Sequence, residues 1–140
     1  MQRLSPEQIS RLLTEHSVRP TRQRLAIAAR LFSGPHRHVT AEALHREVAA
    51  EGHAVSLATV YNTLNHFESL GLLREVNLTP GSAWFDTNTD HHFHYFHEET
   101  GALWDADPAD FGDISIAGLP EGTELARLDI VVRVRSQKNA

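Results

Sequence analysis

The sequence predicts an α+β chain, with helices in its N-terminal half and short strands in its C-terminal half. Up to Gly71, apolar residues recur at helical spacing in segments that each begin at a capping residue; beyond it the period changes to that of strands. The charge divides similarly: residues 1–86 carry nine basic and eight acidic residues, and residues 87–140 carry four basic and ten acidic, giving the net charge of -5. We therefore expect two functional halves.

Four helices are expected in the first half. Ser5-Pro6-Glu7-Gln8 supplies an N-cap, a proline at the first helical position and a capping-box glutamine. Thr21, Thr40 and Ser56 are the expected N-caps of three further helices, which end at Gly34-Pro35, Gly52 and Gly71. The side chains expected to face the core are Ile9, Leu12 and Leu13, then Leu25, Ala28, Ala29 and Phe32, then Ala43, Leu44 and Val48, and finally Leu57, Val60, Leu64 and Phe67.

A β-hairpin is expected after the helices. Its strands are Leu72–Leu78 and Ser82–Asp86, joined through Thr79-Pro80-Gly81. Three helices followed by a hairpin is the order of a winged helix-turn-helix, with the fourth helix of this chain as the recognition helix. The non-core face of that helix offers groups able to meet phosphates or base edges: Ser56, Thr59, Tyr61, Asn62, Asn65 and His66. The alternative is a small helical bundle with an ordinary solvated face.

Short strands are expected in the second half. They are His92–His97, Ala102–Asp105 and Leu125–Arg135, the last with Leu128, Ile130, Val132 and Val134 on one apolar face, and Asp107-Pro108 can start a short helix. A unit of about 50 residues is too small to bury a good core alone, so pairing with a second copy of the chain is expected.

The composition excludes several classes of protein. The apolar fraction of 41% and the charged fraction of 22% are those of a globular protein, and no apolar run approaches the length of a membrane helix. The first residues do not resemble a signal peptide, so we expect a cytoplasmic protein without a membrane partner. The chain has no cysteine, which excludes disulfides, cysteine-ligated zinc, iron–sulfur clusters and thiol catalysis.

Four of the ten histidines lie in the window 91–97. On a strand His92 and His94 point to the same side, and Phe93 and Tyr95 to the other. Carboxylates at the ends of neighbouring strands and a histidine before the third helix complete the expected metal ligands: His38, Asp86, His92, His94 and Asp105. Three imidazoles and two carboxylates suit Fe²⁺, Mn²⁺ or Zn²⁺. The alternatives are a haem held by His92 or His94, and a polar turn that binds nothing.

One sequence feature also resembles that of an enzyme. His92-x-His94-x-x-x-Glu98 resembles the first metal motif of cupins, which would make the chain a small metal oxygenase. A cupin needs a long series of strands, whereas more than half of this chain is predicted to form helices or the hairpin. We therefore expect a binding protein without catalytic residues.

The whole set of motifs resembles the ferric uptake regulator (Fur) family. The similar stretches are Arg19-Pro-Thr-Arg-Gln-Arg24, His38-Val-Thr-Ala-Glu42, Ser56-Leu-Ala-Thr-Val-Tyr-Asn-Thr-Leu64 and the histidine-rich strand. Within the family, the chain is most similar to the iron response regulator branch, through Phe85-Asp-Thr-Asn-Thr89, the absence of cysteine and the segment Glu124–Arg135.

The resemblance implies a homodimeric, metal- or haem-responsive repressor of iron homeostasis that binds double-stranded operator DNA. It implies a winged-helix DNA-binding domain at residues 1–86, a hinge at about 86–90, and a dimerisation and sensing domain at 91–140. One divalent metal per subunit would lie at the five ligands named above, in a spacing similar to that of the peroxide-sensing branch, where iron directs oxidation of ligand histidines. Such a peroxide sensor is the alternative function.

The resemblance also implies contacts to DNA. Tyr61 would press on thymine methyl groups, Arg19 would enter an A·T-rich minor groove, and Arg22 and Arg24 would meet phosphates. Ser56, Thr59 and Asn62 are further candidates. The chain departs from the family in having no four-cysteine zinc site. It also lacks the acidic residue of a second histidine-rich site, where Phe93 stands, so His91 has no expected role.

Overall fold

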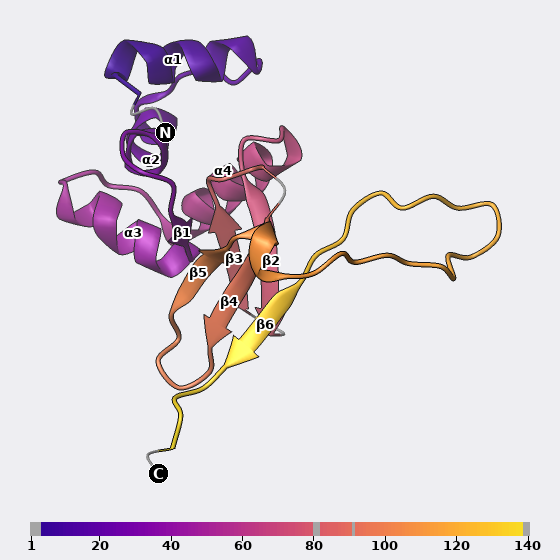
Figure 1. Cartoon of the computed structure of the whole chain (residues 1–140). Coiled ribbons are helices and arrows are strands. Elements are labelled where there is room, and N and C mark those ends of the chain that lie inside the picture. The colour runs from indigo at the N-terminus through magenta and orange to yellow at the C-terminus, as the bar shows by residue number, and fades with distance from the viewer. Residues whose placement is uncertain (1–3, 80–81, 91, 139–140) are drawn as a thin grey trace. The chain divides into compact units, whose positions relative to one another are not determined.

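The computed structural model describes residues 4–79, 82–90 and 92–138, which divide into two compact units, Met1–Thr89 and Asp90–Ala140 (Figure 1). His91 and the turn residues Pro80 and Gly81 lie outside the described residues. The first unit contains the helices α1 (Pro6–Glu15), α2 (Arg22–Phe32), α3 (Ala41–Ala50) and α4 (Leu57–Ser69). Its strands are β1 (His38–Val39), β2 (Arg74–Thr79) and β3 (Ser82–Asp86). The predicted α+β class is confirmed.

The four predicted N-caps are confirmed. Ser5 and Gln8 form the reciprocal capping box of α1, and the side chains of Thr21, Thr40 and Ser56 accept from the backbone of the first turns of α2, α3 and α4. These bonds satisfy amides that a helix leaves without partners at its start. Local chemistry therefore determined where each helix begins.

The core of the first unit differs from the prediction in each helix. Leu12 in α1 and Ala43 in α3 were expected in the core and are only half-buried. In α2 the fully buried side chains are Ile27, Ala28 and Leu31, whereas Leu25, Ala29 and Phe32 are only partly buried against them. The buried stripe is thus rotated around the helix, because α2 packs against α1, α3 and α4 and not against one neighbour. In α4, Leu57 was expected inside but is 38% exposed, whereas Val60 in the same turn is fully buried.

The sheet of the first unit has the strand order β1-β3-β2, with antiparallel pairing throughout. The hairpin β2–β3 is the predicted one, although its first strand begins at Arg74 and not at Leu72. Strand β1 was not predicted: two residues are too short for a periodic signal. Its register pairs His38 with Asp86 and Val39 with Phe85, so it joins the start of α3 to the end of the hairpin.

The second unit is a sheet of order β5-β4-β6, made of β4 (Phe93–His97), β5 (Leu103–Ala106) and β6 (Val131–Val134). Strand β5 is antiparallel to β4, and β6 is parallel to it. The predicted short helix is a single turn of 3-10 helix, η1 (Pro108–Asp110), capped by Asp107. The part of this unit that the structure describes has no α-helix.

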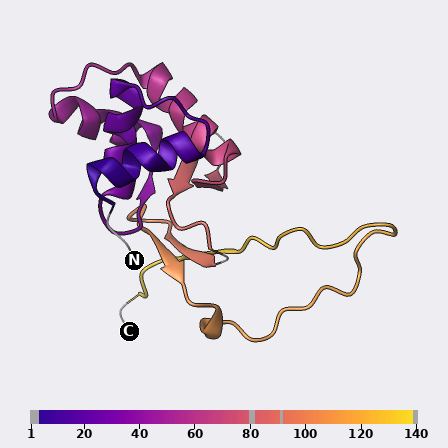
Figure 2. The ribbon, with the colours of Figure 1, turned by 90° about the horizontal axis from the view of Figure 1, so that it is seen from above.

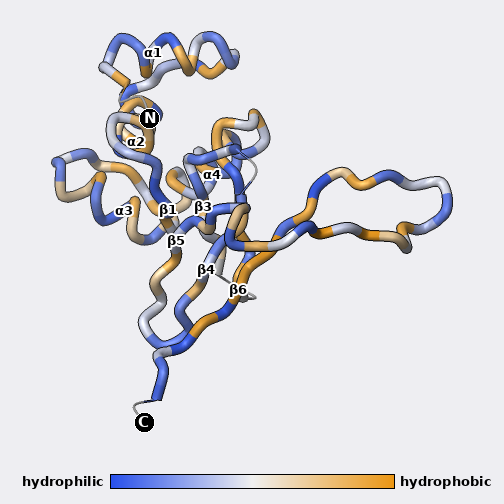
Figure 3. Tube along the Cα trace, in the orientation of Figure 1, coloured by the Kyte–Doolittle hydropathy of each residue, from blue (hydrophilic) through white to orange (hydrophobic). Residues whose placement is uncertain are grey.

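The predicted strand Leu125–Arg135 is wrong over its first half. Val131 pairs with His94 in the parallel register, so residues 125–129 would have to pair with residues that precede β4 and lead out of the unit. Residues 111–130 instead run out and back as one irregular loop (Figure 2). Hydrophobic residues recur along this loop and along β6 (Figure 3), and Ile114, Ile116, Leu119 and Leu125 are exposed.

A partly buried ion-pair network ties α2 and α3 to the segment that precedes β1. Arg37 donates to both carboxylate oxygens of Glu47, at 2.7 and 2.6 Å, and Arg30 donates to the same carboxylate at 2.7 Å. The Arg37 hydrogen bonds are the main cause that lowers the pKa of Glu47 to about 2. Two fork-shaped guanidinium groups on one carboxylate hold its geometry more firmly than a single pair does.

We expect Glu47→Gln to lower the free energy of unfolding at pH 7 by about 1–2 kcal/mol, less than the full pKa shift implies because the network is partly exposed. The folded-state pKa is depressed, so this stabilisation is present above about pH 4.5 and is lost as the pH falls toward 2. Urea denaturation of wild type and variant at pH 7 and pH 3 measures it. Glu51→Gln, which removes a more exposed carboxylate paired with Arg30, should change stability far less. An equal destabilisation by Glu47→Gln at both pH values would contradict the assignment.

Candidate metal centre and nucleic-acid interface

The first unit brings His38 and Asp86 together, as candidate ligands on adjacent strands. The β1–β3 register places them directly opposite each other, and His38 Nε2 lies 3.0 Å from Asp86 Oδ2. Asp86 is completely buried, and its Oδ1 accepts from the amide of Asn88 at 2.9 Å. On the other side of β3 the register places Arg74, also buried, opposite Asp86. A buried carboxylate is stable only when charges and donors surround it.

The second unit brings His92, His94 and Asp105 together. In the β4–β5 register His94 lies opposite Asp105. The Nε2 atoms of His92 and His94 are 3.1 and 3.6 Å from the same carboxylate oxygen, Oδ1 of Asp105. Both imidazoles are buried, at 6% and 3% exposure, and their ring centroids are 4.5 Å apart. Three donor atoms therefore converge on one small volume.

The donor chemistry of this triad fits a divalent cation. Nδ1 of His92 lies in hydrogen-bond contact with the carbonyl of Asp90. When Nδ1–H of His92 donates a hydrogen bond to that carbonyl, Nε2 has no proton and directs its lone pair at the Asp105 oxygen. Two lone pairs repel each other unless a proton or a metal ion lies between them. A carbonyl behind the ring is also the usual outer partner of a metal-ligating histidine, because it fixes the tautomer and the ring orientation. Haem fits less well, since its iron would have to displace Asp105 from both imidazoles.

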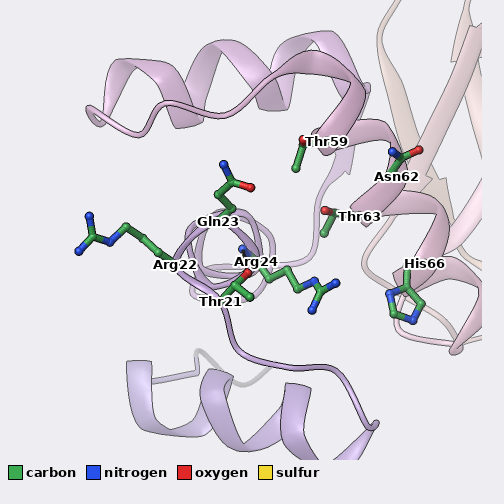
Figure 4. Close-up of a pocket in the computed structure, with 8 residues that line it drawn as sticks. All are labelled: Thr21, Arg22, Gln23, Arg24, Thr59, Asn62, Thr63 and His66. Atoms are coloured by element: carbon green, nitrogen blue, oxygen red, sulfur yellow. Dashed lines mark hydrogen bonds between the residues drawn. The ribbon is translucent and has the colours of Figure 1, made fainter.

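Four of the remaining candidate residues, Arg22, Arg24, Thr59 and Asn62, lie on one surface of the first unit, between the N-terminal turn of α2 and α4. A groove there is lined by Thr21, Arg22, Gln23, Arg24, Thr59, Asn62, Thr63 and His66 (Figure 4). None of the described residues that line it is acidic. Arg24 extends toward α4, whereas Arg22 points away from it. The groove can therefore accept a polyanion along the exposed face of α4.

Other predicted contact residues are held by local bonds. The exposed Arg19 precedes α2, and its carbonyl accepts from Arg24 Nη1 at 3.1 Å. Ser56 accepts from the amide of Thr59 and donates to its hydroxyl at 2.9 Å, so its side chain is occupied as the cap of α4. Asn62 is exposed and faces the groove.

Tyr61 lies on α4 and donates its hydroxyl proton to Glu42 Oε1 on α3, at 2.6 Å. This bond is the main cause that lowers the pKa of Glu42 and raises the pKa of Tyr61. Sequence reasoning missed Glu42, as well as Arg74 and Thr63, because their roles depend on neighbours far away in the sequence. For Arg74 the sequence gives no signal, because an arginine in a hairpin strand is normally expected to be exposed.

Comparisons with known proteins agree on one family. The profile of the Ferric uptake regulator family matches residues 15–129. The peroxide-responsive repressor PerR of Staphylococcus aureus is 36% identical over 93 residues, which make up 66% of this chain and 62% of that repressor. The chain therefore spans less than two thirds of the length of this relative.

Solved structures show the same fold. The ferric uptake regulator from Pseudomonas aeruginosa with manganese superimposes with a TM-score of 0.71 at 28% identity, covering 92% of this chain and 98% of that one. PerR from Streptococcus pyogenes has a TM-score of 0.51 at 25% identity, covering 74% and 71%. None of the helices that the structure describes is long and apolar enough to cross a membrane.

We expect Asp105→Asn to weaken Mn²⁺ binding by at least tenfold, because the amide removes the charge on which both imidazoles converge. Isothermal titration of the metal-free protein measures the affinity. Asp129→Asn is the matched control: it removes the same charge from an exposed pair with Arg127 in the same unit. Equal affinities of wild type and Asp105→Asn would contradict a ligand role.

Proposed function

Because the chain belongs to the ferric uptake regulator family, we propose that it is a dimeric, metal-responsive transcription regulator of iron homeostasis, of the iron response regulator type. The observation that carries the proposal is the convergence of His92, His94 and Asp105 in one unit, while a His38–Asp86 pair lies in the other. Each group alone offers too few ligands to complete the coordination of Fe²⁺ or Mn²⁺. The absence of cysteine supports the iron response regulator branch and excludes a four-cysteine zinc site.

We propose that the pair and the triad bind one divalent ion together. The ion would supply the positive charge that the two carboxylates require. By sharing it, the five side chains would restrict the two units to one relative orientation and so select the spacing at which a dimer reaches both half-sites of an operator. This mechanism uses the domain division proposed from the sequence. Residues 1–86 bind DNA, and residues 91–140 sense the metal and form the dimer.

The proposed DNA contacts are the residues around the groove between α2 and α4. Arg22 and Arg24 supply charge for phosphates, and Arg19 supplies it to a narrow minor groove. On α4, Tyr61 and Asn62 present the groups for base edges, with Thr59 beside them and Ser56 at the cap.

Dimerisation is proposed through the second unit. Tyr95, Trp104 and Val132 share one face of its sheet by the strand register, and Trp104 is 42% exposed. A three-stranded sheet with an exposed aromatic face is too small to be stable without a covering layer. A second copy of the unit supplies such a layer, and sedimentation velocity of the purified chain tests this.

We expect the double variant His92→Ala/His94→Ala to lose the metal dependence of DNA binding. The probe is a duplex enriched from a random-sequence library by the Mn²⁺-loaded wild type, and affinity is measured by fluorescence anisotropy at fixed salt with and without Mn²⁺. The control, His45→Ala/His53→Ala, removes two imidazoles of the first unit outside both ligand groups and should retain the response. A metal response of wild-type size in the His92/His94 variant would rule out the proposed switch.

A peroxide sensor is the second candidate, favoured by the similarity to PerR over 93 residues. Its mechanism would oxidise one of the same buried imidazoles: hydrogen peroxide, the oxidant, would transfer one oxygen atom to a ring carbon and leave as water. Fe²⁺ held by the ligand groups would promote this reaction. Mass spectrometry of the Fe²⁺-loaded protein after hydrogen peroxide treatment separates the two. Oxygen added at His92 or His94 together with loss of DNA affinity favours the sensor, and unmodified histidines favour the metal-responsive regulator.

A further inference from the structure

Glu42 is an acidic side chain on the surface that carries the proposed DNA contacts. It lies in the first turn of α3 and is exposed, and its Oε1 accepts the hydroxyl proton of Tyr61 on α4. A carboxylate beside a DNA-reading tyrosine repels the phosphate backbone, so it weakens binding to every sequence alike. The contact with Tyr61 is where a compensating benefit to recognition would arise.

The contacts of Tyr61 indicate that role. Its ring packs, partly buried, against the hydrophobic core, and its hydroxyl is bound to Glu42 at 2.6 Å. That distance is typical of a strong bond between a hydroxyl and an ionised carboxylate. Because Glu42 has a lowered pKa and Tyr61 a raised one, acceptor and donor both keep these forms at neutral pH. A ring anchored at both ends has one orientation, and its exposed edge is fixed before DNA arrives.

We propose that Glu42 is a positioning residue for sequence recognition, which holds Tyr61 in the orientation that reads bases. The proposal rests on the DNA-binding function proposed above. A side chain that is already ordered loses less conformational entropy when it binds. Tyr61 contributes this gain only on a DNA sequence that offers the matching base to its ring. Glu42 is therefore expected to increase the ratio of the affinities for matching and non-matching DNA. Its negative charge, in contrast, lowers the affinity for all DNA.

The test compares affinities of the Mn²⁺-loaded full chain for the enriched duplex and for a scrambled duplex of equal length, at fixed salt. We expect Glu42→Ala to lower the ratio of the two affinities about fivefold, while binding to the scrambled duplex stays equal or becomes tighter. Glu42→Gln removes the charge but retains an oxygen acceptor, so it should keep most of the ratio. Glu15→Ala, an exposed residue in the last turn of α1, controls for the change in net charge. If Glu42→Ala leaves the ratio unchanged, Glu42 is only a surface charge and the proposal is overturned.

A double-mutant cycle tests whether Glu42 acts through Tyr61. Tyr61→Phe removes only the hydroxyl, so adding Glu42→Ala to it should cause no further loss of the ratio; an additive loss would contradict the proposal. Tyr61→Ala distinguishes failure of the positioning role of Glu42 from failure of the proposed DNA-binding function. If Tyr61→Ala abolishes discrimination and Glu42→Ala does not affect it, only the positioning role fails. If wild type discriminates no duplex, or Tyr61→Ala changes nothing, the recognition-helix assignment fails and the inference fails with it.

Discussion

The buried carboxylate of Asp86 is the constraint on which the small sheet of the first unit depends. It is the last residue of β3, and it has no exposed surface. An ionised group without water must be surrounded by donors and opposite charge, and the sheet supplies these from both neighbouring strands. The register places His38 on one side and Arg74 on the other, and the chain returns the amide of Asn88 to the same carboxylate. A strand of only two residues, β1, is thereby fixed in place.

Helix α3 connects this constraint to the surface of α4. Its N-cap is Thr40, two residues after His38, and its Glu47 binds Arg37 on the other side of that histidine. Its first turn carries Glu42, which holds Tyr61. His38 is thus flanked in the sequence by two attachments to one helix, and that helix also orients the exposed tyrosine. A shift of the histidine must move or strain α3, since helices do not deform continuously in a packed core.

The second unit differs from the first in which side chains it buries. Two of its candidate ligands, His92 and His94, are buried, whereas Asp105 is exposed. On the other side of β4, Phe93 is buried and Tyr95 is partly exposed. Phe111 gives partial cover, with its ring 5.0 Å from Phe93 and 6.1 Å from Tyr95. The irregular segment 111–130 adds exposed apolar side chains and no second layer. The unit thus buries two imidazoles, while Trp104, opposite Tyr95, stays 42% exposed.

The sequence by itself determined the helix starts, the hairpin and the common side of His92 and His94, because caps, turn residues and the two-residue period of a strand are local properties. It also limited any metal site to nitrogen and oxygen ligands. Only the tertiary structure decided which face of α2 is buried, why the last strand starts at Val131 and not at Leu125, and that β1 exists at all. The partners of Asp86 and Tyr61 likewise came from the structure. These features depend on which strand edge or helix face is available after folding, and that information is spread over residues distant in the chain.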